Sequence, residues 1–432
     1  MSNDMMRINI SQLQAWALIF FTVAFLQIPI RIPIPTTELI WPNFWIFPLV
    51  ATALSLTHWK ISKFALSHIF VYTIVLALST QLGYQEIVET GERLKSIPLA
   101  VAYFSTFLLL AELRHTLLDR RKLGHYFHIA AGLLLLFSLI EIFSAPIREF
   151  SNSICGILYG TFYSSDARDL SFAGFIRPKA FAYEPSHNAF TITVLSILGG
   201  FCKNKRKDHI KSLILCILAF TIVVSPLVFG LAAIYVFSNF HMLFPKLKKG
   251  VTAILFASIA LAIVSIALVN FHEPTRNRID NILTGQDGSI KMRTVNQVIF
   301  AAESLKLSPL FGVGIGGEGE IENEIRGLYL FKWKRGNFVQ TLMLSPLFTL
   351  ITFTGLAGLS WLSFSQFSIS KKYLPHDYQN YLIVAFGFLL FSGSIITTGV
   401  WIVLGLILGC SEKAGSSIDT HSVQIENRVT TV

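Results

Sequence analysis

The chain has 432 residues, of which 53% are hydrophobic and only 14% are charged. A soluble domain carries about a quarter charged residues, so this composition excludes a soluble globule and favours a polytopic membrane protein. The net charge of +10 does not indicate nucleic-acid binding, because the basic residues are dispersed among the connections between apolar segments. The four cysteines show neither a disulfide framework nor zinc spacing.

Apolar segments recur along the whole chain, each long enough or nearly long enough to cross a bilayer. We predict an all-α, polytopic integral membrane protein with about 12 transmembrane helices of about 20 residues each. The first run is expected to be retained, because no small-residue cleavage site follows it. Around Ser225 and Pro226 the sequence allows two alternatives: two short spans joined by a tight turn, or one kinked helix. The predicted spans are 12–30, 38–57, 64–82, 97–113, 127–145, 187–202, 209–224, 226–244, 250–270, 337–365, 380–394 and 395–411.

Connections rich in Lys and Arg alternate with connections that are poor in them. The positive-inside rule makes the rich connections cytoplasmic, which puts both termini in the cytoplasm and requires the Ser225 region to cross twice. Residues 1–411 then form one membrane domain, and the polar tail, 412–432, is expected to be cytoplasmic and disordered. The rich connections carry Lys60 and Lys63; Arg114, Arg120, Arg121 and Lys122; Lys203, Lys205, Arg206, Lys207 and Lys211; Lys246, Lys248 and Lys249; and Lys371 and Lys372.

Two longer connections, 145–187 and 271–336, fall on the periplasmic side and are also basic. Long translocated segments are less bound by the charge rule, so their cations need another explanation. Anion binding is the simplest one. We therefore expect these two loops to carry the chemistry of the protein.

The first candidate site is FIRPKAFAYEPSHNAF, residues 175–190, at the end of the first long loop. Arg177 presents a planar fork of donors that suits phosphate, and Lys179 adds a second cation. Glu184 stands before a proline where a helix can begin, and His187 follows. The alternative interpretation is an interfacial anchor, since cations at a helix end commonly meet lipid headgroups.

The second candidate site is residues 288–320. Arg293 begins a predicted amphipathic helix that Pro309 ends, and GVGIGG follows with Gly312 and Gly314. Glycine allows close backbone approach to a ligand. A structural turn is the alternative, because no Walker lysine follows and the run is not a dinucleotide fingerprint. The predicted apolar face of the helix consists of Val295, Ile299, Ala302 and Leu305.

An acidic run with a spacing of two follows the glycines. Alternate carboxylates suit a divalent cation, but neither an Asp-x-Asp pair nor a histidine cluster supports them. The alternative is a solvated acidic loop that balances the basic residues after it, and we predict no metal and no cofactor. The acidic residues are Glu318, Glu320, Glu322 and Glu324, and the basic ones are Lys332, Lys334 and Arg335.

Few ionisable residues lie within the predicted spans, where Glu112 and Glu141 stand near helix ends. Ion-coupled transporters show ionisable residues at mid-membrane depth or broken helices. The sequence also lacks an ATP motif and a Ser-His-Asp set. These features disfavour a transporter or an ATP-driven pump.

Together these motifs resemble the O-antigen polymerase and ligase superfamily (Wzy-type and WaaL-type proteins). The resemblance covers roughly residues 170–365 and the overall number of spans. It lies in the order of four elements: an Arg-led motif entering a helix, a helix pair with Ser225 at its turn, an Arg-led helix ending in Pro-Leu-x-Gly-x-Gly, and a closing Gly-x-x-Gly. The residues that carry it are Arg177, Ala180, Phe181, Glu184, Pro185 and Ala189; Arg293, Pro309, Leu310, Gly312 and Gly314; and Gly355 and Gly358.

The resemblance implies a GT-C-like glycosyltransferase of the bacterial inner membrane. Such proteins take sugar from undecaprenyl pyrophosphate at the periplasmic face, in some cases with a chain-length regulator as partner. In this interpretation Arg177 and Arg293 bind the pyrophosphate and Lys179 assists them, with Gly312, Gly314 and Arg335 as further candidates. Glu184 is the general base and His187 the alternative, since the pKa of histidine is closer to neutral.

Two departures bear on the choice within the superfamily. Ligases typically carry a histidine about a dozen residues before the closing Gly-x-x-Gly, whereas residues 343–355 contain none. The cation common at the serine turn is also missing, since Pro226 follows Ser225. We therefore expect a polymerase of lipid-linked repeat units. An O-antigen ligase or another lipid-linked sugar transferase, a transporter or flippase, and a non-catalytic scaffold remain as alternatives.

Overall fold

The computed structural model describes most of the helical part of the chain. Among the described residues the regular structure is helical, apart from one antiparallel pair of two-residue strands, β1 (Ile32–Pro33) and β2 (Ile40–Trp41). This confirms the all-α prediction. The described residues are 10–28, 32–33, 40–41, 43–116, 119–159, 169–170, 175–203, 205–243, 276, 280, 295–322, 345–375, 377–391 and 399–411.

The bundle consists of α1 (Ile10–Gln27), α2 (Ile46–Leu56), α3 (Lys63–Leu82), α5 (Ile97–Glu112), α6 (Arg120–Phe143), α9 (Pro185–Lys203), α10 (Arg206–Val223), α11 (Pro226–Ser238), α19 (Pro346–Tyr373), α20 (Tyr378–Phe391) and α21 (Val400–Cys410). Shorter or peripheral elements are α4 (Thr90–Leu94), η2 (Leu113–His115), α7 (Ala145–Tyr159), α12 (Phe240–Leu243), α16 (Val295–Leu307) and η3 (Glu318–Ile321). Within the described residues, α3, α6 and α19 are long and apolar enough to cross a membrane. The fold is therefore compatible with a membrane protein, while the number of spans stays a prediction.

Most of the predicted spans coincide with these helices. The main exception is 38–57, where β2 comes first and the helix begins only at Ile46. Asn43 forms a turn there, because its side chain accepts a hydrogen bond from the Trp45 amide and donates one to the Phe25 carbonyl. The predicted span 250–270, the start of 337–365, and the tail 412–432 lie outside the described residues.

Local signals in the sequence explain several helix starts. Ser62 and Asp119 are N-caps of α3 and α6, and each accepts a hydrogen bond from a first-turn amide. Proline stands in the first turn of α5, α11 and α19, where its missing N–H costs nothing. The helix predicted to begin beside Glu184 does begin there, at Pro185.

The Ser225 region is a hairpin of two helices. Val224 has φ +52°, which ends α10 and turns the chain. His209, in the first turn of α10, lies 2.6 Å from the hydroxyl of Tyr235 near the end of α11. The chain therefore reverses direction, as the alternation of loop charge requires, and the single kinked helix is wrong.

One end of the bundle, here called the basic end, gathers the Lys/Arg-rich connections that the structure describes. Glu112 at the end of α5 accepts hydrogen bonds from Ser62 before α3 and from Tyr373 at the end of α19. Arg120 at the start of α6 donates to the carbonyl of Ser411, just after α21. The structure thus places together the connections that the sequence assigned to one side of the membrane.

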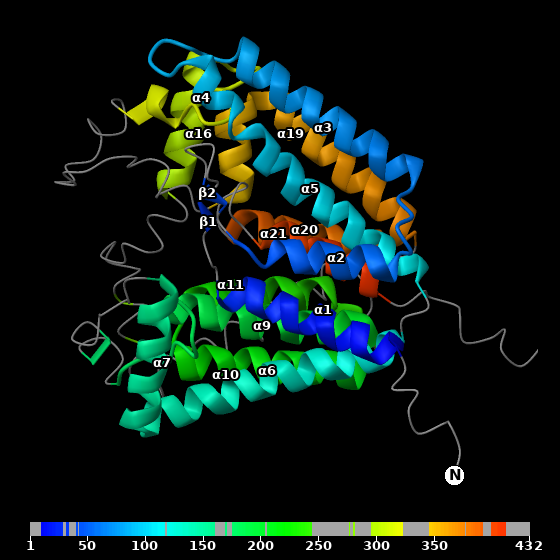
Figure 1. Ribbon diagram of the computed structural model, residues 1–432, viewed down its shortest axis with the longest axis vertical. Helices are drawn as coiled ribbons and strands as arrows, with labels where there is room; N and C mark the ends of the chain where they lie inside the picture. The colour runs from blue at the N-terminus through cyan, green and yellow to red at the C-terminus, as the bar shows by residue number, and fades with distance from the viewer. Residues whose placement is uncertain are drawn as a thin grey trace, which may run out of the picture.

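The opposite end, here called the site end, gathers those candidate residues of the two long loops that the structure describes. Gln27 at the end of α1 donates to the carbonyls of Lys179 and Ala180, which precede α9. Figure 1 shows α7, α4 and α16 at this same end, with α7 running across the ends of α6 and α10. The first part of the predicted long loop, 145–187, contains the helix α7.

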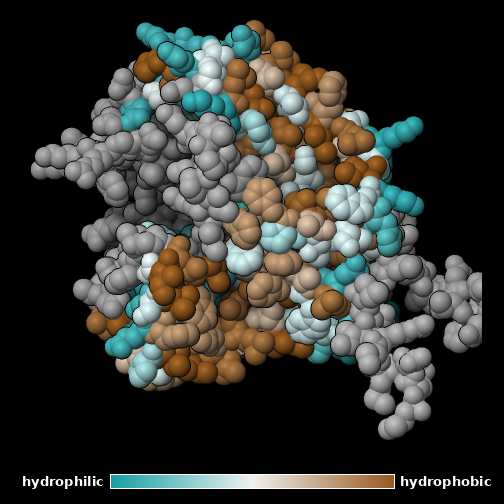
Figure 2. Space-filling model, in the orientation of Figure 1, coloured by the Kyte–Doolittle hydropathy of each residue, from teal (hydrophilic) through white to brown (hydrophobic). Residues whose placement is uncertain are grey.

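The core between α3, α5, α19 and α21 is aromatic. Tyr72 stacks on Trp361 with ring centroids 4.4 Å apart, and Phe104 meets the edge of Trp401 at 5.5 Å. On the outside, Figure 2 shows hydrophobic side chains along the face formed by α3 and α19. The exposed residues there include Leu66, Phe70, Ile74, Leu78 and Phe364, which suits contact with lipid.

Candidate functional site

The first candidate site is a buried cationic segment, residues 175–184, which leads into α9. Arg177 forms an ion pair with Asp169, with Nη2 and Nε at 2.8 and 2.9 Å from Oδ1. Both side chains are buried. Arg177 therefore has a carboxylate partner that the sequence did not reveal, eight residues upstream.

Polar side chains from three helices hold the backbone of this segment. The Glu141 carboxylate, in the last turn of α6, accepts the amides of Lys179 and Ala180 at 3.1 and 2.7 Å. Ser151 of α7 accepts the amide of Phe181 at 3.2 Å. Gln27 completes the set from α1, with its amide nitrogen 2.6 Å from the Ala180 carbonyl.

The held backbone is strained. Ala180 and Phe181 are successive non-glycine residues with φ of +47° and +70°. Such left-handed residues each cost about 1–3 kcal/mol and persist only where the surroundings fix them. Glu141, Gln27 and Ser151 are those surroundings.

Lys179 extends from the strained turn toward α7. Its Nζ donates to Asn152 Oδ1 at 2.9 Å, and the residue is buried. Beside it, Cys155 donates a weak hydrogen bond to the Ala182 carbonyl. Burial raises the pKa of the Cys155 thiol to about 11, so this cysteine is an inert packing group and not a nucleophile.

Glu184 and His187 form a second, more open pair in the first turn of α9. His187 Nε2 lies 3.7 Å from Glu184 Oε1, with the two side chains 46% and 28% exposed. Ser186 donates to the same Glu184 oxygen. The structure thus brings the two predicted bases together at the surface, while the two predicted cations next to them are buried.

The second candidate site, the glycine segment (residues 308–321), is bound into a break in α19. Gly355 has φ +59° and interrupts the helix. The amides of Val313 and Gly314 donate to Thr352 and Phe353, each at 3.0 Å. In return the amides of Leu356 and Ala357 donate to Pro309 and Leu310, also at 3.0 Å. The sequence showed no sign of a broken helix.

Gly312 and Gly314 therefore have a clear structural use. Their φ angles are +65° and +76°, conformations that glycine adopts without strain. The amide of Gly312 donates to Ser308, and its carbonyl accepts from the Tyr84 amide. A Cβ on Gly312 would come within 2.4 Å of the Thr352 carbonyl oxygen. These contacts agree with a structural turn, and ligand binding at the glycines stays a prediction.

A buried ion pair fastens the glycine segment to the loop between α3 and α5. Arg93 pairs with Glu320, and both side chains are fully buried. Glu320 also accepts the amides of Glu86, Ile87 and Val88 at 3.0–3.2 Å. Glu320 is thus a structural anchor and not a solvated carboxylate, which corrects that interpretation of the acidic run.

Burial shifts the pKa values of two charged groups in this region, Arg93 and Glu318. Loss of solvation lowers the pKa of Arg93, and the negative charge of Glu320 opposes that change. Burial raises the pKa of Glu318, against a smaller opposing effect from Arg93. In the described part of the chain, no group of three or more His, Cys, Asp or Glu side chains is placed to hold a metal ion.

The predicted apolar face of α16 is only partly covered by the bundle. The fully buried residues are Asn296, Gln297, Phe300, Ala301 and Ser304, whereas Val295 is 50% exposed. The polar side chains serve the packing, since Ser304 donates to the Thr352 carbonyl and Gln297 accepts the Ser345 amide. Of the predicted face, Ile299 packs against the hydrophobic core, while Val295 and Ala302 are exposed.

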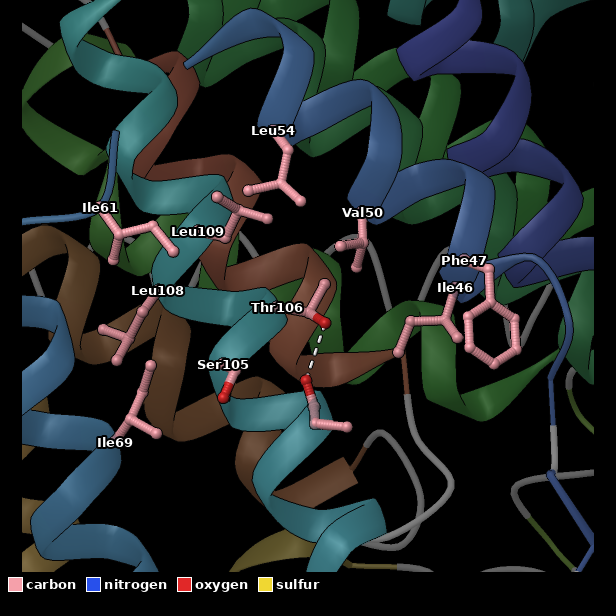
Figure 3. Close-up of a pocket in the computed structure, with 11 residues that line it drawn as sticks. Ile46, Phe47, Val50, Leu54, Ile61, Ile69, Ser105, Thr106, Leu108 and Leu109 are labelled. Atoms are coloured by element: carbon pink, nitrogen blue, oxygen red, sulfur yellow. Dashed lines mark hydrogen bonds between the residues drawn. The ribbon is translucent and has the colours of Figure 1, made fainter. Parts of the chain in front are cut away.

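An apolar groove of about 340 Å³ lies between α2, α3 and α5 (Figure 3). Of the ten lining residues labelled in Figure 3, eight have hydrocarbon side chains. The hydroxyl of Thr106 bonds back to the Ala102 carbonyl in its own helix. The groove thus suits a hydrocarbon chain better than a sugar.

The remaining predicted residues, Arg293 and Arg335, lie outside the described residues. Asp169, Glu141, Gln27 and Asn152 are the site residues that the sequence did not single out. Gln27 and Glu141 gave a weak signal, as polar residues near the ends of predicted spans, whereas Asp169 and Asn152 lie inside the predicted long loop and gave none. No protein-family model matches the chain, and neither a curated protein nor a solved structure matches it significantly.

Proposed function

We propose that this protein is a membrane glycosyltransferase that polymerises oligosaccharide repeat units carried on undecaprenyl pyrophosphate. The observation that carries the proposal is the cationic segment, where the buried cations Arg177 and Lys179 directly precede the strained backbone of Ala180 and Phe181 at one end of an apolar helical bundle. Strained backbone that its surroundings hold in place is concentrated at functional sites.

The proposed chemistry assigns different roles to the buried and the open groups. Arg177 exchanges Asp169 for the diphosphate and stabilises the charge that develops as the glycosidic C–O bond breaks. Lys179 assists, and Arg293 is the proposed second guanidinium. Glu184, or His187 in its place, takes the proton from the acceptor hydroxyl. Direct displacement then inverts the anomeric carbon.

Three features of the structure support this assignment. The open Glu184–His187 pair suits a base that meets an acceptor from solvent. The buried Arg177 suits a group whose partner must be desolvated, where charge interactions are stronger. The groove in Figure 3 is apolar enough to take part of a polyprenyl chain. In this proposal the site end faces the periplasm of a bacterial inner membrane.

The break in α19 is a feature that transporters also use. In transporters the freed backbone groups of such a break coordinate the substrate or ion. Here the groups next to Gly355 bind the glycine segment instead. The break therefore gives transport no specific support.

The proposal is tested by complementing a deletion strain and profiling its polysaccharide. Arg177→Ala should lower the yield of long polymer by about 10²- to 10³-fold, as expected when a donor to developing charge is lost. Lys306→Ala is the matched control, since Lys306 is an exposed cation at the same end. Unchanged chain length in Arg177→Ala, at normal membrane levels, would contradict the site assignment.

The deletion strain itself separates the alternatives. Lipopolysaccharide capped with single repeats indicates a polymerase, whereas missing caps with accumulated lipid-linked polymer indicate a ligase. Unchanged glycans contradict both. Mapping Arg177 to the cytosolic side with a membrane-impermeant label would also end the proposal.

A further inference from the structure

The helix α7 has three distinct faces. An apolar stripe is formed by Phe150 and Ile157, which are seven residues apart and exposed by 54% and 79%. Positions seven apart lie on the same side of a helix. A second face, with Ser151 and Cys155, is buried against the cationic segment.

The third side is polar and exposed at Glu149. A helix that packs on a protein and otherwise meets water has one apolar face, which the protein covers, and its exposed faces are polar. Separate apolar, buried and polar sides fit a helix that touches lipid, protein and water at once.

The apolar stripe is continuous with the outer face of α6. Only Ser144 separates α6 from α7, and α6 is one of the helices long and apolar enough to span a membrane. The exposed residues of α6 include Leu133, Leu136 and Ile140. Figure 2 shows hydrophobic side chains over the region where α6 and α7 meet.

We propose that α7 is an interfacial helix whose stripe of Phe150 and Ile157 is seated in the lipid bilayer at the site end, next to the exposed Phe143 that ends α6. A helix that begins where a span ends, and then runs across the bundle (Figure 1), lies at the depth of the lipid headgroups. The hydrocarbon boundary of the bilayer covers the stripe, because the same apolar surface continues along the lipid-facing side of α6.

The position of α7 also sets the position of Lys179. Asn152 of α7 accepts the Lys179 ammonium, and Ser151 accepts the Phe181 amide. A helix fixed at headgroup depth thus holds the cationic segment at the level where a lipid carries its phosphates. This second step rests on the proposed function, whereas the seating of α7 does not.

Single cysteines with an environment-sensitive fluorophore test the seating. Phe150→Cys and Ile157→Cys probe the stripe, and Glu149→Cys is the matched control on the polar side of the same helix. All three positions are exposed. Ile157 is the cleaner probe, because the ring of Phe150 also meets the ring of Phe181 at a centroid distance of 6.0 Å. The full chain is placed in phosphatidylethanolamine–phosphatidylglycerol bilayers, with labelling of the wild-type cysteines as the baseline.

We expect nitroxide on lipid acyl chains to quench the labels at Phe150 and Ile157 several-fold more strongly than the control label at Glu149. Aqueous iodide should show the opposite order. Equal iodide quenching at all three positions would overturn the proposal. Stripe labels that neither quencher reaches would also overturn it, because a protein partner would then cover the stripe. The readout needs no enzymatic activity, so failure of the proposed function leaves it valid.

Discussion

The cationic segment and the glycine segment both contain left-handed backbone, but only the cationic segment is strained by it. Both contain left-handed residues, but Gly312, Gly314 and Gly316 adopt them without strain, whereas Ala180 and Phe181 do not. The glycine segment is bound mainly by backbone hydrogen bonds to α19. The cationic segment is bound by side chains of α1, α6 and α7. A relaxed turn is what a structural joint needs, while a strained turn with many side-chain partners is typical of a functional site.

The comparison predicts that the glycine segment matters most for stability. Glu320→Gln removes the charge that Arg93 and three backbone amides share, and leaves a buried cation unpaired. We expect a loss of about 3–5 kcal/mol in the free energy of unfolding, measured by denaturation in detergent. Glu89→Gln in the same loop is the control, since Glu89 is exposed. Equal effects of both substitutions would show that the Arg93–Glu320 ion pair does not anchor the glycine segment.

The break in α19 should tolerate only glycine. Gly355→Ala places a Cβ 2.6 Å from the Leu310 carbonyl oxygen, at a φ of +59°. We expect a loss of at least about 2 kcal/mol from left-handed strain and overlap together. Gly132→Ala in α6 is the control, since a Cβ there meets nothing within 4 Å. Its melting temperature should equal or exceed that of the wild type.

The cationic segment should lose activity before stability. Glu141→Gln weakens the hold on the amides of Lys179 and Ala180, for an expected loss of about 1–2 kcal/mol. Polymer yield should fall at least tenfold, because the cations lose their placement. Glu112→Gln is the control, a buried carboxylate at the basic end that binds Tyr373. It should cost similar stability and leave chain length unchanged. Loss of polymer in both variants would show that activity falls with stability in general and not with the placement of the cationic segment.

The smallest effect concerns pH. Burial raises the pKa of Glu318, so the folded chain binds this proton more tightly than the unfolded chain does. The contribution of this group to stability is therefore present at low pH and is lost as pH rises through the folded pKa. Glu318→Gln should melt above the wild type at about pH 8 and match it near about pH 4. A variant that melts lower at the higher pH would show that the charge of Glu318 is favourable next to Arg93.

Hydropathy and loop charge predicted most of the helices and grouped their basic ends, because those signals are local or simply periodic. Pro185 likewise marked the start of α9. The partners of the site residues were not predictable, because Asp169, Glu141 and Gln27 reach the cationic segment through tertiary folding. The residues of α16 that pack against the bundle were not predictable, because helical periodicity shows an apolar stripe without showing whether protein or lipid covers it. The break at Gly355 was missed because GxxG also occurs in continuous helices.

The broken helix α19 has a consequence for how the chain enters the membrane. Its two parts leave backbone donors and acceptors open at Gly355, and hydrocarbon cannot satisfy them. The groups that close the gap belong to residues 309–314, which are synthesised before α19. Placing α19 in a membrane therefore depends on a segment that is synthesised before it, and biogenesis has to deliver the two together.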